Sequence, residues 1–439
     1  MKLSKTILMA GVIGLGMASM ASAQTYIRFT GSSAFRATMH GAIQASLDAG
    51  YTYAYTESAA NGLGKGSQAI FHGTINSGAN EVYIKTSWTG SEAGIQVVGQ
   101  GSTTKFLPDT TSMTSGGNAL GTAAASTCVQ ETANIALSDT LQSTSQFSDT
   151  ATYQLTEVNN GTVGIVPFVW CASKGAAALM TSGSNIYTWQ IQNLISTGYI
   201  PGAMLSGNSL DQAKKIYALG RNPDSGTRLI AFAEAGLGAL YKTAHQYAPL
   251  STNATGTNTL ITGGTSTIAR IHQWPVESIN GISTKTAGNS GYDSGGNLAY
   301  AIGSDDSSFK VAAASTTAVA TVNAQAAVTN GGFIAYISVS DASGKAYGSG
   351  KSGQVLSYNG AAYSVAAVQE GLYPFWSYEH MYVNNTAWAN STIQSYANAV
   401  AGLLQNATTS STPAVSIPLA SMHVSRDPTK DASAITQNY

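Results

Sequence analysis

The chain has 439 residues, a net charge of −1 and a charged fraction of only 9%. This charge balance, with no basic stripe and no acidic tail, argues against a nucleic-acid-binding protein. The apolar fraction of 43% supports a buried core, and the length exceeds what one core sustains, so the composition predicts a globular protein of two lobes or domains.

The N-terminal segment has the three parts of a secretory signal peptide. A basic start, Met1–Lys5, leads into an apolar run from Ile7 to about Met20, and small residues follow as far as Ala23. The run is shorter than the ~20 apolar residues of a membrane span, and no cysteine follows it as a lipoprotein anchor requires. We therefore expect cleavage after Ala23 and a mature protein that is periplasmic or secreted.

After residue 23, short apolar runs alternate with amphipathic helical patterns, which is typical of α/β architecture. Strands are predicted at 26–29, 81–85, 161–169, 215–219 and 333–339. Helices are predicted at 35–49 with Gly50 as C-terminal cap, at 189–195 before Gly198, at 229–237 and at 393–404. Stretches rich in Ser, Thr, Ala and Gly at 100–130, 250–268 and 305–330 are predicted to be insertions or solvent-facing β-hairpins.

The chain has two cysteines, Cys128 and Cys171. In an oxidising compartment one disulfide between them is a fair expectation. Two separate buried thiols are the alternative, and the sequence leaves both open. No pair of histidines or cysteines has the spacing of a metal site, so no metal and no cofactor is expected.

Four short segments place small hydrogen-bonding residues between a predicted strand and a helix. They are Thr30–Phe35, Thr89–Ile95, Leu137–Thr140 and Gly220–Thr227. The free N–H groups at a helix start and the positive end of the helix dipole together form an anion site. Each segment alone is more often an ordinary helix cap, so only the set of four indicates anion binding.

The fourth segment carries the strongest signal. Arg221 lies four residues before the turn formed by Ser225, Gly226 and Thr227. Its guanidinium offers a fork of donors that matches a tetrahedral oxyanion, and the turn adds hydroxyl and N–H donors. A surface arginine or an ordinary ion pair is the alternative interpretation.

With these motifs in this order, the chain resembles the phosphate-binding proteins of bacterial high-affinity phosphate transporters. That family has a Thr-Gly-rich opening turn, a Gly-Ser-x-x-Gly turn, an Ala-Ser-Asp turn and an Arg-x-x-x-Ser-Gly-Thr turn, which correspond to 30–35, 90–94, 137–139 and 221–227. Further matches at 164–169, 332–336 and 371–382 extend the resemblance over nearly the whole mature chain. The resemblance implies an α/β, two-lobed periplasmic-binding-protein-like fold of type 2, with a mixed sheet flanked by helices in each lobe and a hinge of two crossovers.

The resemblance also implies which residues hold the anion. These are Ser33, Ala34 and Phe35 (the last two through backbone N–H groups), Ser91, Asp139, Arg221, Ser225, Gly226 and Thr227. Ala34 stands where the family usually has a threonine, so one hydroxyl contact is lost or comes from Ser32 or Ser33. Glu92 follows Ser91 where the family has a small residue, so its carboxylate must point away from the anion or the ligand must differ.

Asp139 provides an argument about selectivity. A carboxylate that faces an anion is tolerated only if a proton lies between them. Phosphate still carries a proton near neutral pH and sulfate carries none, so sulfate leaves two buried acceptors unpaired. This favours phosphate, or arsenate as its mimic. A simple helix cap is the alternative role for Asp139.

Three functional hypotheses follow. The first is a monomeric receptor that captures phosphate for the membrane permease of an ABC transporter. The second is a secreted two-lobed binder of another oxyanion or small polar ligand, without a transporter. The third is a hydrolase built on Asp293–Gly296, which is similar to the nucleophile stretch of chymotrypsin-like proteases. No histidine lies in a supporting motif, so an enzyme is not expected.

The predicted first lobe comprises 24–165 plus 372–439, and the second comprises 166–371. Ser33–Phe35, Ser91 and Asp139 are expected on the first lobe, and Arg221 with the 225–227 turn on the second. Hinge closure would then bring the two sets around one anion and expel water.

Overall fold

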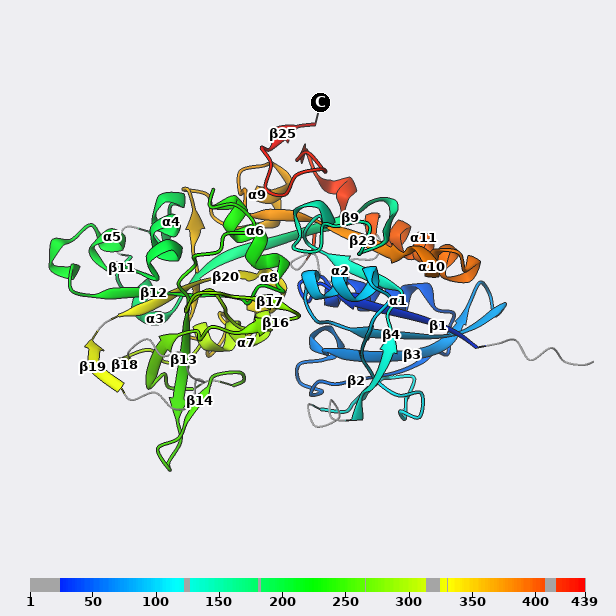
Figure 1. Cartoon of the computed structure of the whole chain (residues 1–439), viewed down its shortest axis with the longest axis horizontal. Helices are drawn as coiled ribbons and strands as arrows, with labels where there is room; N and C mark the ends of the chain where they lie inside the picture. The colour runs from blue at the N-terminus through cyan, green and yellow to red at the C-terminus, as the bar shows by residue number, and fades with distance from the viewer. Residues whose placement is uncertain are drawn as a thin grey trace, which may run out of the picture.

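The computed structural model describes residues 24–121, 127–180, 183–264, 266–312, 324–329, 331–406 and 416–438, so the predicted signal peptide lies outside the described residues. One long mixed sheet runs through both halves of the molecule (Figure 1). In spatial order its strands are β11 (Tyr199–Pro201), β12 (Lys215–Leu219), β20 (Gly332–Ser338), β9 (Leu155–Ala172), β23 (Trp376–Asn384), β8 (Ile135–Ser138), β1 (Thr25–Gly31), β4 (Asn80–Ser87), β3 (Gln68–Ile75), β2 (Thr52–Tyr55) and β6 (Asn118–Ala119).

The 18-residue strand β9 joins the two lobes. Its first part pairs antiparallel with β23, as far as Pro167, and its last part, from Phe168, pairs antiparallel with β20. The chain returns to the first lobe along β23, which also pairs with β8. The α/β class, the two lobes and the two crossovers predicted from the sequence are confirmed, whereas the exact lobe boundaries remain a prediction.

The direction of the strands decides where a ligand can lie. In the first lobe β1 is parallel to both β4 and β8, and in the second lobe β12 is parallel to β20. The pairings of β8 and β20 with the two crossing strands bring the carboxyl ends of both sets, Ser138 and Ser338, to the lobe junction. Open α/β sheets bind their ligands at such ends.

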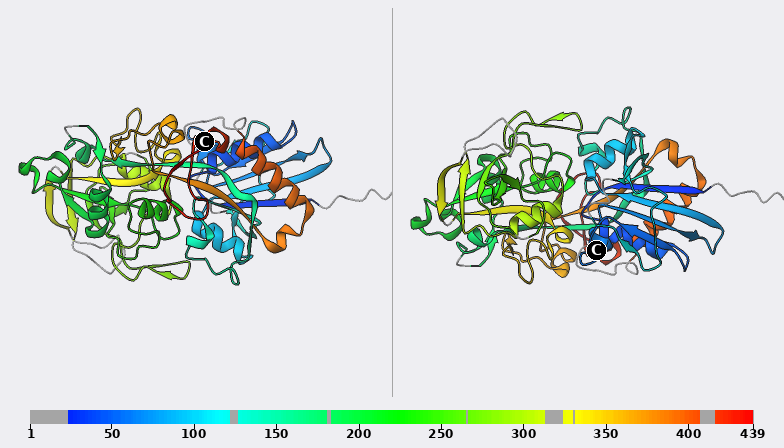
Figure 2. Two further views of the ribbon diagram at one scale, coloured as in Figure 1. Left: turned by 90° about the horizontal axis from the view of Figure 1, so that it is seen from above. Right: turned by 90° about the horizontal axis from the view of Figure 1, so that it is seen from below.

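Helices cover both faces of the sheet, as Figure 2 shows. In the first lobe α1 (Arg36–Ser46) and α11 (Ser391–Gln405) pack on one face, and α2 (Ser91–Gly99) packs on the other within a separate apolar cluster. The second lobe carries α3 (Lys174–Ala177), α4 (Thr188–Thr197), α5 (Ala203–Ser206), α6 (Gly226–Glu234), α7 (Gly295–Ile302), α8 (Val339–Ala342) and α9 (Val365–Gln369). Short α10 (Asn385–Trp388) precedes α11.

Two helix ends illustrate how local sequence sets boundaries. Gly198 adopts the left-handed conformation (φ 83°) and its N–H donates to the Leu194 carbonyl at 2.8 Å, so it caps α4 as predicted. The helix predicted to reach Gly50 instead ends at Ser46, because Leu47 is already extended and the Asp48 N–H bonds the Thr74 carbonyl of β3 at 2.9 Å. Tertiary pairing therefore ends this helix before its glycine.

Antiparallel strand pairs lie within or at the edge of the three Ser/Thr/Ala/Gly-rich stretches. They are β5 (Thr103–Phe106) with β7 (Val129–Thr132), β13 (Tyr247–Thr252) with β14 (Asn258–Leu260), and β18 (Ser308–Ala312) with β19 (Ala324–Thr329). The last two pairs form a five-stranded sheet with β15 (Arg270–Gln273) in the second lobe. The remaining short strands are β10 (Asn185–Ile186), β16 (Ser278–Ile279), β17 (Ile282–Ser283), β21 (Gln354–Val355), β22 (Ser357–Tyr358), β24 (Val424–Ser425) and β25 (Thr436–Gln437).

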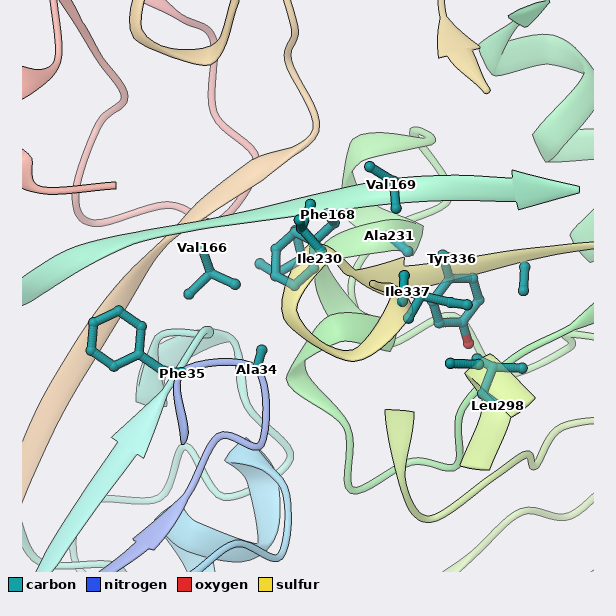
Figure 3. Close-up of a cluster of buried hydrophobic side chains, with 14 of the residues drawn as sticks. Ala34, Phe35, Val166, Phe168, Val169, Ile230, Ala231, Leu298, Tyr336 and Ile337 are labelled. Carbon is teal, nitrogen blue, oxygen red and sulfur yellow. The ribbon is translucent and has the colours of Figure 1, made fainter. Parts of the chain in front are cut away.

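Apolar side chains continue the core across the lobe junction. Figure 3 shows Phe35 at the start of α1 pointing toward Val166, with Ile230 and Ile337 of the second lobe beyond them. All four side chains are buried. The junction is therefore held by apolar packing as well as by the polar contacts described below.

The disulfide expected between Cys128 and Cys171 is not formed, and both thiols are free. Cys171 is fully buried in β9 within the main core, whereas Cys128 packs against a separate cluster that contains Ile70 and Leu107. The two cysteines belong to different packing units, which is the physical reason why they do not pair.

Candidate functional site

Asp139 lies at the centre of the candidate site. It follows β8 directly and is 1% exposed. The Ser91 hydroxyl donates to Oδ1, and the Thr227 hydroxyl donates to Oδ2 at 3.2 Å. Ser91 begins α2 of the first lobe and Thr227 lies in the first turn of α6 of the second, so one carboxylate receives hydroxyl groups from both lobes.

The start of α6 faces this carboxylate. Ser225 is the N-cap, and its hydroxyl accepts the Arg228 N–H at 3.3 Å. Gly226 is the first helical residue and lies directly against Asp139 and Ser91. The positive end of the α6 dipole is thereby directed at a negative group.

Arg221 is buried beside the site, and two of its guanidinium nitrogens bind backbone carbonyls. Its Nε donates to the Tyr292 carbonyl and its Nη2 to the Asp293 carbonyl, each at 3.0 Å. It forms no ion pair with Asp139 within 4 Å among the described residues, although its charge acts on that carboxyl. The loop before α7 therefore positions the guanidinium next to the carboxylate without direct contact.

The electrostatic state of Asp139 reflects these neighbours. Burial raises the pKa of its carboxyl, and the hydrogen bonds from Ser91 and Thr227 and the charge of Arg221 act against that effect. The pKa remains above its ordinary value. The carboxyl is therefore able to hold or share a proton more readily than an exposed aspartate.

The first predicted turn reaches the junction by another route. The Ala34 carbonyl accepts the hydroxyl of Ser340, from the start of α8, at 2.8 Å. Ser33 lines the cleft between the lobes, and the Phe35 ring is buried in the core. Within the described part of the chain, no hydrogen bond joins these three residues to Asp139 or Arg221.

Glu92 is buried, and its carboxylate has its own set of hydrogen-bond donors. Its carboxylate accepts the hydroxyls of Thr140 at 2.9 Å and Ser145 at 2.7 Å, and the Gln146 N–H at 3.0 Å. Burial raises the pKa of Glu92 to about 7, against the effect of these donors. The side chain is turned away from Asp139 into a polar nest of its own, so it does not oppose an anion at the candidate site.

A second buried carboxylate at the junction, Asp341, was not predicted from the sequence. Asp341 on α8 pairs with Arg36 of α1 at 3.3 Å, and Lys65 of the first lobe donates to the Ser340 carbonyl beside it. The signal for Asp341 was present: a carboxylate two residues beyond the buried strand at 333–339 follows the same rule that selected Asp139.

Glu379 was also missed, for a different reason. It lies on β23 next to the end of β8, is 0% exposed, and neither of its carboxyl oxygens has a hydrogen-bond partner within the described residues. Burial, and secondarily the charge of Asp139, hold its pKa well above the ordinary range, and the nearby Ser32 hydroxyl acts against that effect. A lone glutamate in a strand normally indicates the solvent-facing side, so no sequence signal marked it.

No group of three or more His, Cys, Asp or Glu side chains in the described part of the chain is arranged to hold a metal ion. None of the helices that the structure describes is long and apolar enough to cross a membrane.

No protein-family model matches the chain, and no curated protein matches it. Solved structures do. A substrate-binding protein assigned to phosphate ABC transport, from Clostridium perfringens and with bound phosphate, is 13% identical with a TM-score of 0.43, covering 88% of this chain and 95% of its own. An ABC-type phosphate transport receptor from Vibrio cholerae is 11% identical with a TM-score of 0.40, covering 87% and 96%. PstS from Borrelia burgdorferi is 8% identical with a TM-score of 0.34, covering 88% and 94%.

Proposed function

We propose that this protein is an exported solute-binding protein that captures a small oxyanion, phosphate first, between its two lobes and presents it to the permease of an ABC-type uptake system. The observation that carries the proposal is the position of Asp139. Its buried carboxyl receives hydroxyl groups from Ser91 of one lobe and Thr227 of the other, at the start of α6 and beside Arg221.

Opening of the hinge separates the two sets of groups. Ser91 and Asp139 stay with the first lobe, and Arg221 and the 225–227 turn stay with the second. An oxyanion then takes donors from the Ser91 and Thr227 hydroxyls, from the N–H groups that begin α6, and from the guanidinium. Closure removes water and strengthens each of these bonds.

Asp139 gives this site its preference for phosphate. Its carboxylate accepts the proton that phosphate retains, whereas sulfate offers only acceptors, and two unpaired buried acceptors are costly. A binder of an unprotonated anion would have no use for a carboxylate in this place.

Calorimetry of the mature protein against phosphate, arsenate and sulfate tests the function. Phosphate and arsenate should bind, and sulfate should bind at least ~100-fold more weakly. The Asp139→Asn variant should lose phosphate affinity and retain or gain sulfate affinity. Asp149→Asn, a change at an exposed aspartate, is the matched control. Equal binding of phosphate and sulfate by the unaltered protein would refute the role of Asp139.

A further inference from the structure

A cleft of about 540 Å³ lies between the lobes beside the candidate anion site. Ser33, Ser87 and Thr89, which follow or end β1 and β4, form part of its first-lobe wall. Asp224 and Ser294, which precede α6 and α7, form part of its second-lobe wall. Sites for organic ligands have volumes of about 300–1,000 Å³, so this cleft has room for far more than one tetrahedral ion.

Two buried polar atoms in the cleft walls have no partner among the described residues. One is Oγ of Ser87, a residue that is 0% exposed, and the other is Oδ1 of Asp224, which is 7% exposed. The second oxygen of Asp224 is satisfied by the Asn280 amide at 2.6 Å. Unmade hydrogen bonds of buried groups are costly, and such groups in a cleft wall indicate a ligand that completes them.

The chemistry of these two atoms restricts the ligand. Burial raises the pKa of Asp224 to about 6, against the effect of Arg221, so above that pH the free oxygen is a negatively charged acceptor. It repels a second anion and requires a donor. The Ser87 hydroxyl both donates and accepts. Both requirements are met by hydroxyl groups.

Other residues of the cleft wall are also suited to binding hydroxyl groups. Its other polar groups include the amides of Gln68 and Asn297, which suit hydroxyl groups in either role. The Arg36 guanidinium also lines the cleft, but it is already engaged by the Gly64 carbonyl and the Asp341 carboxylate. The exposed Lys105 ammonium lines the first-lobe wall as well, so the cleft combines hydroxyl-binding groups with one further positive charge.

We propose that the cleft binds the polyol part of a phosphate ester, such as a glycerol or sugar phosphate, whose phosphate group occupies the site formed by Asp139, Arg221 and the start of α6. This inference rests on the proposed function, because the ester is anchored through the same oxyanion site. A phosphate monoester has a second pKa of about 6, so at pH 6.5 a fraction of it still carries the proton that Asp139 accepts. The ester hydroxyls form the missing hydrogen bonds to Oδ1 of Asp224 and Oγ of Ser87.

Calorimetry with orthophosphate, glycerol 3-phosphate and glycerol separates the two parts of the ligand. At pH 6.5 the unaltered protein should bind glycerol 3-phosphate at least ~10-fold more tightly than orthophosphate, because two additional hydrogen bonds form. In Ser87→Ala and Asp224→Asn variants the ratio of ester affinity to orthophosphate affinity should fall by ~5–10-fold. Ser209→Ala, at an exposed serine, should leave that ratio as it is in the unaltered protein.

The outcomes distinguish this inference from the proposed function. If orthophosphate binds and the ester binds no more tightly, or if both variants leave the ratio unchanged, the cleft does not receive a polyol and only this inference fails. If neither orthophosphate nor the ester binds, the proposed function fails as well. A thermal melt of each variant confirms that it is folded.

Discussion

Gly226 lies so close to Asp139 that a side chain at position 226 has no room. A Cβ atom there would stand 1.7 Å from Oδ1 of Asp139 and 2.7 Å from Oγ of Ser91. Because Gly226 belongs to the second lobe and Asp139 to the first, this glycine allows the lobes to close over the carboxylate.

Gly226→Ala should therefore weaken anion binding by about 1–3 kcal/mol, since closure now requires overpacking. Global stability should change little, because alanine is favoured within helices. Calorimetry and a thermal melt measure the two effects. Gly402→Ala on α11, where a Cβ meets no atom within 4 Å, is the control and should raise the free energy of unfolding by roughly 0.5–1 kcal/mol. Unchanged affinity in Gly226→Ala would show that closure at this contact is not part of binding.

Arg221→Ala should weaken phosphate binding by about 2–5 kcal/mol, the cost of halving a buried charged interaction. Arg221→Lys keeps the charge but cannot bond the Tyr292 and Asp293 carbonyls with one planar fork, so it should recover only part of the loss. Lys174→Ala, at an exposed position, controls for general electrostatics. Unchanged phosphate affinity in Arg221→Ala would show that the guanidinium does not contribute to binding.

Asp341 should stabilise the closed arrangement in a pH-dependent way. Burial by itself raises the pKa of this carboxyl, but the charges of Arg36, Lys345, Lys65 and Arg221 outweigh it, and the pKa lies below its ordinary value. A lowered pKa in the folded state means that the stabilisation is present above the unfolded value of about 3.9 and is lost as the pH falls through the folded value.

Asp341→Asn should accordingly lower the free energy of unfolding at pH 7 by about 3–5 kcal/mol, as breaking a buried ion pair does. Urea denaturation at pH 7 and below pH 4 measures the difference, which should shrink as the pH falls. A difference that stays constant over this range would mean that the Asp341 charge contributes nothing to stability.

Glu379 should lower the stability of the folded protein as the pH rises, the opposite of the effect of Asp341. Its raised pKa keeps the folded state protonated, so the carboxyl costs stability as the pH rises from the unfolded value of about 4.3 toward the folded value. Glu379→Gln, which stays neutral, should be more stable than the unaltered protein at pH 7 by about 1–3 kcal/mol. The two proteins should converge near pH 4. Urea denaturation at both pH values measures this, and a less stable glutamine variant at pH 7 would indicate that an ionised Glu379 is held by a donor.

Much of the local structure could be predicted because it depends on neighbours in sequence. The strand at 215–219 has the bounds that its apolar pattern predicts, and Gly198 ends α4 because only a residue tolerant of positive φ fits there. The helix predicted to end at Gly50 shows where local patterns are insufficient. It ends at Ser46, because Asp48 forms a hydrogen bond with β3.

The candidate site could be predicted only in part. Ser91, Asp139, Gly226 and Thr227 are in contact, whereas the Arg221 fork binds two backbone carbonyls and Ala34 binds Ser340. Asp341 could have been predicted, because it follows a buried strand just as Asp139 does. Glu379 could not, because its burial depends on pairing between β23 and β8, which strand alternation does not reveal.

The sequence by itself determined the α/β class and the polar turns that follow the parallel strands, because hydrophobic period and turn chemistry are local properties of the chain. Only the tertiary structure decided which of these turns meet. Asp139 and Thr227 are 88 residues apart in the chain, and their contact depends on how β9 and β23 join the two lobes. The states of Glu92, Asp341 and Glu379 were likewise decided by folding, because a carboxylate takes its charge from the burial and donors that distant segments provide.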